Sequence, residues 1–237
     1  LGRGIPQTRW PCRSCRGRAE GCEACEGTGL QYPDSVQDLI GEPFRLVLSA
    51  ENTSFHGMGR EDIDVRCLGR GRPFVLEVKH PRVRRTDLEE VMKVVNSNGA
   101  DKIEISDLRW TNRSEVSRVK ETRAEKSYTI RFSVEEQPEE SFIIESISKL
   151  SGVTLEQQTP KRVSHRRADL IRKRKVVSID NVVVEDSEVQ FSVRCEAGTY
   201  VKELVHSDEG RTVPSVAGVL GSPCEVIWLD VEDIHAD

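Results

Sequence analysis

The sequence predicts an α+β protein with a mixed, largely antiparallel sheet, helices on one face of that sheet, and a small cysteine-rich knuckle at its N-terminal end. Segments that alternate like strands are separated by single helical segments, which is typical of this class. Four of the seven cysteines fall within the first 25 residues. At 36% hydrophobic and 32% charged, the 237-residue chain has an ordinary composition and enough length for a substantial core.

The N-terminal cysteines form two C-x2-C pairs, Cys12 with Cys15 and Cys22 with Cys25. Two such pairs supply the four thiolates that tetrahedral zinc prefers, so we expect a structural zinc ion there. No secretory signal is visible at the first residues, and we therefore expect a cytoplasmic location in which thiols stay reduced. Disulfides, or a knuckle that no longer binds metal, are the alternatives.

The first half of the chain is expected to hold two strands and two helices. A connector and short helix precede the first strand, a long polar loop follows it, and a capping box at Thr86 and Glu89 opens the second helix, which Gly99 closes. The expected segments are a helix within Pro33–Glu42, a strand at Phe44–Ala50, a loop at Glu51–Gly71, a strand at Phe74–His80 and a helix at Thr86–Asn96.

The second half is expected to be richer in strands. The turn Asp186-Ser187 predicts a hairpin between two of them. Expected strands are Lys102–Trp110, Glu115–Thr122, Ser127–Val134, Val176–Val184, Val189–Cys195 and Cys224–Asp230. Expected helices are Ser141–Leu150, with Phe142, Ile143, Ile147 and Leu150 facing inward, a short helix from Thr199, and Pro214–Leu220.

The charge is unevenly distributed. The formal net charge is −5, from 35 basic and 40 acidic residues, so a surface that is basic throughout is excluded. The run Lys161–Lys175 nevertheless carries +7, which leaves −12 for the rest. This run predicts a local surface for a polyanion, with an ordinary solvated face as the alternative. No apolar stretch approaches the roughly 18 residues of a membrane-spanning helix, so we expect no membrane association.

Three short motifs, in a fixed order, resemble those of a known family. Gly198–Leu204 reads G-T-Y-V-K-E-L and resembles the third motif of the pseudouridine synthases. Arg60-Glu61-Asp62 resembles the motif that carries their catalytic aspartate, and Lys126-Ser127-Tyr128 resembles the strand that carries their active-site tyrosine. Their order along the chain also matches, so the resemblance implies the pseudouridine synthase fold.

Longer matches narrow the resemblance to the archaeal and eukaryotic tRNA pseudouridine synthases that modify the T loop, the tenth of the named families. These matches begin at Gly59 (G-R-E-D-I-D-V-R), at Gln158 and at Ala197 (A-G-T-Y-V-K-E-L-V-H). Ser207 departs from the pattern, where the family has glycine. The family also implies a larger N-terminal RNA-binding domain, which this stretch does not contain.

The resemblance implies that uridine is isomerised to pseudouridine at T-loop position 54, position 55 or both, without an organic cofactor. Asp62 is then the ionised carboxylate at the sugar, acting as a nucleophile at C1′ or as a base on the neighbouring carbon. Lys202 favours its charged form. Arg60 occupies the space of the everted base, for which its planar guanidinium is suited.

The resemblance places two further residues in the catalytic set. Tyr128 stacks on the uracil and takes part in moving the C5 proton, although a tyrosine on a sheet face is the structural alternative. Leu204 forms an apolar floor beneath Asp62, and a plain core leucine looks the same in sequence. Asp64 is a rival nucleophile, because in an extended loop it points to the same side as Asp62.

The implied partner is the T arm of tRNA, with no obligate protein partner. Eversion of the target base requires compensating backbone contacts. Besides Tyr128, the expected substrate-binding residues are Arg66, Arg162, His165, Arg166, Arg167 and Arg172. Residues 1–32 are then the zinc knuckle and 33–237 the catalytic domain. Alternatives are a non-catalytic RNA-binding zinc-knuckle module and a zinc-knuckle module that binds proteins.

Overall fold

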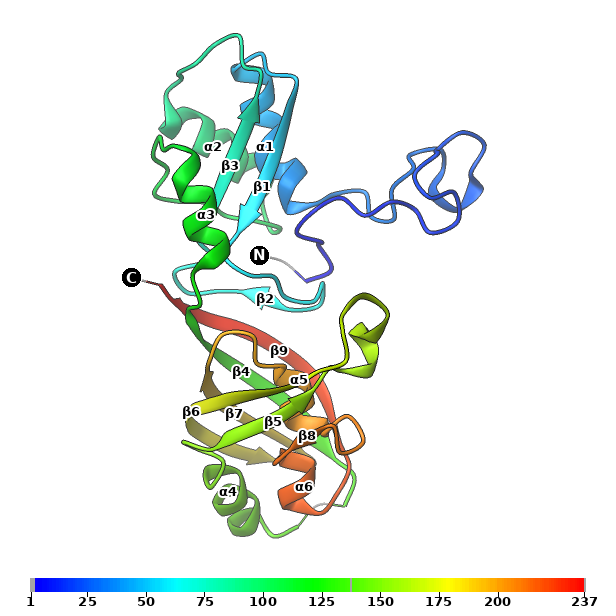
Figure 1. The fold of residues 1–237 in the computed structure, drawn as a ribbon, viewed down its shortest axis with the longest axis vertical. Coiled ribbons are helices and arrows are strands. Elements are labelled where there is room, and N and C mark those ends of the chain that lie inside the picture. Colours follow the sequence, from blue (N-terminus) through cyan, green and yellow to red (C-terminus); the bar gives the residue numbers. More distant parts are fainter. Residues whose placement is uncertain (1–2, 137, 237) are drawn as a thin grey trace. The chain divides into compact units, whose positions relative to one another are not determined.

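The computed structural model describes residues 3–136 and 138–236, which form two compact units (Figure 1). The first unit comprises the chain up to Arg66 together with Arg72–Thr122. The second comprises Cys67–Gly71 and the chain from Arg123 onward. The second unit is therefore built from two separate stretches of sequence.

The described residues of the first unit form three α-helices, one 3-10 turn and a two-stranded sheet. Strands β1 and β3 pair antiparallel, with Phe55 opposite Leu76, and the Phe55 and Phe74 rings stack at 5.2 Å. Apolar side chains of α1 and α2 pack together as its core. The elements are η1 (Glu23–Cys25), α1 (Val36–Val47), β1 (Asn52–Gly57), β3 (Phe74–Lys79), α2 (Leu88–Asn98) and α3 (Arg113–Glu121).

The strand predicted at Phe44–Ala50 is wrong, because α1 continues through Pro43 to Val47. Apolar residues recur every four positions across the proline, and all of them are buried: Val36, Ile40, Phe44 and Leu48. This helical period outweighs the local alternation in F-R-L-V-L, which leaves Leu46 61% exposed. The predicted loop Glu51–Gly71 is also only partly correct, since it contains β1 and β2.

The strands predicted between Lys102 and Thr122 are wrong as well. Residues 102–110 form no strand, and Ile105 instead exchanges two hydrogen bonds with the Asn96 side chain, at 2.8 and 2.9 Å. The next segment is α3, whose N-cap Asn112 accepts from the Ser114 N–H. The strand at Phe74 and the helix closed by Gly99 are confirmed, although Asp87 rather than Thr86 caps α2.

The second unit is a seven-stranded sheet in the order β2-β9-β4-β7-β6-β5-β8. The register is antiparallel in the five pairings of this sheet that the described residues define, which involve β4 to β9. Helix α4 packs against β6 and α6, and α5 packs against β9 and α6 (Figure 1). The strands are β2 (Arg66–Cys67), β4 (Glu125–Val134), β5 (Thr154–Gln158), β6 (Ile171–Glu185), β7 (Glu188–Cys195), β8 (Thr212–Val213) and β9 (Cys224–His235). The helices are α4 (Glu140–Ser148), η2 (Lys161–Arg166), α5 (Val201–His206) and α6 (Val216–Leu220).

Strand β4 supplies much of the core of the second unit, because it lies between β7 and β9. Its inward residues alternate from Tyr128 to Val134, and Phe132 meets Phe191 of β7 edge to face at 5.9 Å. The predicted β6–β7 hairpin is confirmed, with Asp186 at its turn. Of the four residues of the predicted helix Ser141–Leu150 that were expected to face inward, Phe142 is the exception, at 46% exposed.

The stretch Cys67–Gly71 is attached to the sheet through β9. The Leu68 N–H donates to the Val231 carbonyl at 2.8 Å, and Arg70 forms a bidentate ion pair with Asp233 at 2.8 and 3.1 Å. Hydrogen bonds from Arg70 lower the pKa of Asp233. In the described part of the chain, no helix is long and apolar enough to cross a bilayer.

Candidate active site and metal site

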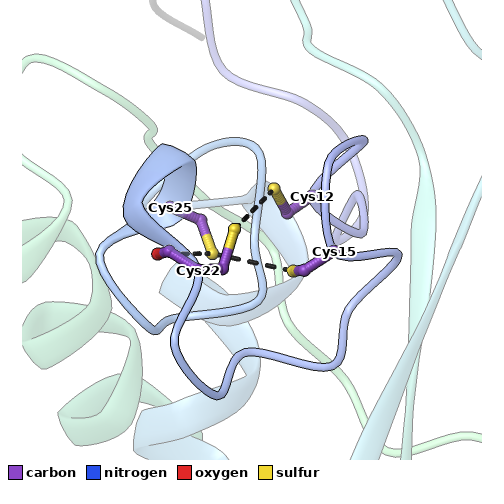
Figure 2. Close-up of side chains that lie close together, drawn as sticks. All are labelled: Cys12, Cys15, Cys22 and Cys25. Carbon is purple, nitrogen blue, oxygen red and sulfur yellow. Dashed lines mark hydrogen bonds between the residues drawn. The ribbon is translucent and has the colours of Figure 1, made fainter.

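The four knuckle cysteines converge although no secondary-structure element but a short 3-10 turn holds them (Figure 2). Two short stretches run side by side at the base of the knuckle, where the Cys12 N–H donates to the Gly29 carbonyl and the Gln31 N–H to the Trp10 carbonyl, at 2.8 and 2.9 Å. Gly29 has φ +72° and its N–H also donates to the Cys25 sulfur at 3.2 Å. The backbone thus turns the thiols inward.

The sulfur positions fit a tetrahedral metal. All four Sγ atoms lie within 4.8 Å of one another, with 4.0 Å between Cys12 and Cys22 and 3.8 Å between Cys15 and Cys25. Four sulfurs at about 2.3 Å from one zinc ion are about 3.8 Å apart. A disulfide needs about 2.05 Å, so the structure gives no support to that alternative. The donor set therefore fits a thiophilic divalent cation.

The knuckle thiols also differ electrostatically from the cysteines of the sheet. The backbone N–H of Ala19 lowers the pKa of Cys15 to about 6, whereas the adjacent Cys25 sulfur raises the pKa of Cys22 to about 11. A shared cation would favour the thiolate at all four positions. Burial raises the pKa of both Cys195 and Cys224 to about 12, which makes them poor ligands and poor nucleophiles.

The loop that carries Asp62 is held at several points within the first unit. Arg72 donates to the Met58 carbonyl at 2.7 Å and pairs with Glu61 at 3.2 Å, so one guanidinium holds the backbone just before the R-E-D motif and the middle residue of that motif. Asp62 is half-buried. The loop is a turn at Ile63 and Asp64, with the Val65 N–H donating to the Asp62 carbonyl at 3.1 Å.

This turn corrects the expectation for Asp64. The expected extended backbone, which would place both carboxylates on one side, is not present. Asp64 is exposed, and its carbonyl accepts from Arg3 at 2.7 Å. Among the two acids, Asp62 is thus the one that is partly removed from water.

Arg60 lies over an aromatic residue that the sequence analysis did not select. Its Cζ is 5.3 Å from the Trp10 ring centroid, and Trp10 also meets Tyr32 edge to face at 5.6 Å. These two aromatic residues flank the knuckle, one before Cys12 and one after Cys25. The only sequence signal was a tryptophan two positions before the first cysteine of a metal-binding motif. The contact connects the knuckle with the R-E-D loop.

The other predicted catalytic residues belong to the second unit. Tyr128 lies on β4 at 4% exposed, opposite Val193 of β7 and Val231 of β9. Leu204 on α5 is fully buried and Lys202 is half-buried. The expected strand and short helix are confirmed, while the convergence of these side chains with Asp62 stays a prediction.

Buried polar contacts fix the start of α5. The Gln157 amide, which is fully buried on β5, donates to the Tyr200 carbonyl and accepts from the Tyr200 N–H, both at 2.9 Å. Glu203, which is 1% exposed, pairs with Arg162 of the basic run at 2.6 Å. Neither Gln157 nor Glu203 was selected from the sequence, because a glutamine in a strand and a glutamate in a helix are common surface residues.

The basic run Lys161–Lys175 is not a single surface. Residues 161–166 form η2, with Val163 buried beneath it, and the run continues into β6. Arg162 bonds to Glu203, whereas His165 and Arg167 are exposed and Arg172 is half-buried. For Arg166 only the backbone is described. Arg66 begins β2.

Comparison with known proteins identifies the family. The family model described as "Pus10, C-terminal" matches residues 1–235. The chain belongs to this family. It is 49% identical over 99% of its length to a tRNA pseudouridine synthase Pus10 of Methanothrix thermoacetophila, and 45% identical over 99% to that of Methanocaldococcus jannaschii. It spans 51% of both relatives, about half of their length.

A solved structure supports the fold. The chain resembles one in a structure described as "Crystal Structure of a Cbf5-Nop10-Gar1 Complex", with a TM-score of 0.51 and 21% identity, over 84% of this chain and 45% of that one. Together with membership of the Pus10 C-terminal family, this likeness confirms the predicted pseudouridine synthase fold. The identity is low, so the likeness concerns the fold alone.

Proposed function

We propose that this chain is the catalytic part of a tRNA pseudouridine synthase that acts on the T loop, at position 54, position 55 or both. The observation that carries the proposal is the 49% identity, over nearly the whole chain, to a tRNA pseudouridine synthase. The local structure supports it, since each of the three motifs lies on a segment fixed by its own unit. A non-catalytic RNA-binding module is the second candidate.

The proposed mechanism uses side chains from both units. Asp62 acts at the ribose as the C1′–N1 bond breaks, either as nucleophile on C1′ or as base on the adjacent carbon, and Lys202 favours its charged form. The detached uracil rotates and bonds to C1′ through C5, which then loses its proton while N1 gains one. Tyr128 stacks on the uracil and takes part in the proton transfer at C5, while Leu204 excludes water. Arg60 leaves Trp10 and fills the space of the everted base.

The activity is tested by tritium release from a T-arm stem-loop RNA labelled at uridine C5. Asp62→Asn should lower the release rate by about four orders of magnitude, as loss of an essential catalytic group does in other enzymes. Asp64→Asn is the matched control, two residues away in the same turn, and should retain the rate. Equal rates in both variants would contradict the assignment, and RNA binding without release by the unmodified chain would favour the second candidate.

We further propose that the knuckle holds one structural zinc ion, because its four sulfurs match the spacing of a tetrahedral thiolate site. No catalytic step requires the metal. Elemental analysis of the purified chain should find one zinc per chain. Cys15→Ser should lose it, and Cys224→Ala, which removes a thiol of the sheet, should keep it. A metal-free chain with an unchanged melting temperature would contradict this proposal.

A further inference from the structure

The first residues of β6 place two arginines on one face of the sheet. The register sets Arg172 opposite Gln157 and Arg174 opposite Leu155 of β5. Both β5 residues are fully buried, so this is the inner face of the strand pair. Lys173 lies between the arginines on the opposite face, where it pairs with Glu156 at 3.4 Å.

The same inner face supports the turn that begins α5. Gln157 holds the backbone of Tyr200 there, two residues after Gly198. The Arg174 guanidinium lies directly on this glycine, since a Cβ at position 198 would be 3.5 Å from its Nε and 3.6 Å from its Nη2. The third motif therefore has a guanidinium packed against its first residue.

Arg174 has an unusual set of partners. Its Nη1 donates to the Lys173 carbonyl at 2.6 Å, and its Nε is buried without a hydrogen-bond partner among the described residues. Nη2 has no partner in the same part of the chain and is not a buried atom. A buried donor without an acceptor is rare in proteins and requires an explanation.

Two more arginines lie close by: Arg167 contacts the side chain of a residue of the same turn, and Arg172 lies on the same inner face of β6 as Arg174. Arg167 donates to the Tyr200 hydroxyl at 3.2 Å, and Arg172 donates to the Thr159 hydroxyl at 2.7 Å and the Leu170 carbonyl at 3.2 Å. Within the described residues, Arg167, Arg172 and Arg174 form no ion pair with a carboxylate. All of their acceptors are neutral oxygens, so their positive charges are uncompensated.

The acids nearby are engaged elsewhere. Glu196 accepts from the Lys175 N–H at 2.8 Å, Glu203 pairs with Arg162 at 2.6 Å, and Asp169 pairs with Arg211 at 2.8 Å. Three arginines at this turn and on the adjoining inner face of β6, with free N–H groups and without a carboxylate partner among the described residues, favour an anion with several acceptor oxygens.

We propose that Arg167, Arg172 and Arg174, here named the arginine clamp, bind a phosphodiester group of the RNA beside the start of α5. The inference rests on the proposed function and narrows it to one part of the basic run. Arg174 is the central residue of the clamp, whereas Arg162 acts through Glu203 to position α5. A phosphate held beside Gly198 would fix the RNA backbone close to Lys202, which belongs to the same motif.

The test compares two substitutions that remove the same charge from adjacent residues. Fluorescence anisotropy measures the affinity of the chain for a labelled T-arm stem-loop RNA over a series of salt concentrations. Arg174→Gln should weaken binding and reduce the slope of log affinity against log salt by roughly 0.7 to 0.9, the value for one lost phosphate contact. Lys173→Gln, on the opposite face, should leave this slope close to that of the unmodified chain. Melting curves establish that both variants fold.

Equal slopes for the two variants would overturn the clamp. A site for free anions would also overturn it. In that case inorganic phosphate at constant ionic strength would raise the melting temperature of the unmodified chain but not of Arg174→Gln, while the two proteins would bind RNA with the same affinity. Failure of the proposed function is seen separately, as absence of tritium release by the unmodified chain from bound RNA, whatever the slopes.

Discussion

Gly69 is the residue on which the attachment of Cys67–Gly71 to the sheet depends. It has φ +56°, and a Cβ there would overlap the backbone carbonyl oxygen of Glu232. Gly71, two residues later, has φ +75° and no atom within 4 Å of its Cβ position. Both positions therefore require a residue that tolerates positive φ, and position 69 also requires one without a Cβ atom.

Gly69→Ala should lower the free energy of unfolding by about 3 kcal/mol, because the strain of positive φ is added to a backbone overlap. Gly71→Ala should lower it by about 1 kcal/mol, from the backbone conformation alone. Urea denaturation of both variants measures the difference. Equal losses would show that the strand next to residue 69 moves away easily.

Single residues of the candidate site were predictable only where a motif named them. Asp62, Tyr128 and Lys202 came from short patterns, and each lies on a defined local structure. Trp10, Gln157 and Glu203 were not predicted, because their roles depend on partners that are 40 or more positions away in the chain. Gln157 and Tyr200 are 43 positions apart, and Arg162 and Glu203 are 41 apart. Trp10 likewise contacts the distant Arg60. Pairing of this kind is not visible in local sequence.

At the level of elements, the pair Arg162–Glu203 joins η2 to α5. Glu203 is 1% exposed, and its carboxylate accepts two hydrogen bonds from Arg162, at 2.6 and 3.2 Å. An ion pair of this kind contributes little net stability, but loss of one member leaves the other uncompensated inside the protein.

Arg162→Met should therefore lower the free energy of unfolding by about 3 kcal/mol, and the double variant Arg162→Met, Glu203→Gln should regain part of this loss. Arg167→Met is the matched control, since Arg167 is exposed and bonds only to a hydroxyl, and it should change stability by less than about 0.5 kcal/mol. Chemical denaturation of the unmodified chain, the single variants Arg162→Met and Glu203→Gln, and the double variant gives the coupling. Additive effects of the two substitutions would contradict a mutual dependence.

The elements differ in how far the sequence determined them. The β6–β7 hairpin and β4 were predicted because alternation and a turn signal agreed. Phe44–Ala50 failed because its local alternation is part of a longer helical period. The segment 102–110 failed because the Asn96 side chain supplies hydrogen bonds that a neighbouring strand would otherwise supply. A longer period in the sequence decided the first case, and a side-chain partner decided the second.

For the whole molecule, the discontinuous second unit leads to a direct prediction. A fragment of residues 123–237 lacks Cys67–Gly71 and leaves the β9 side of the sheet uncovered, which favours association. Joining residues 66–71 to its C-terminal end by a flexible linker should raise the melting temperature. The same fusion carrying Gly69→Ala should not. Equal melting temperatures for all three fragments would show that this stretch adds nothing to the sheet.

The strand order also sets a delay during protein synthesis. Arg70 and its partner Asp233 are 163 residues apart in the chain, so at 5 to 20 residues per second the ribosome completes β9 roughly 8 to 33 seconds after Arg70. Throughout that interval Cys67–Gly71 projects from the nascent chain without its sheet. Two glycines and a charged arginine within five residues make this projection a poor template for premature contacts with other nascent chains.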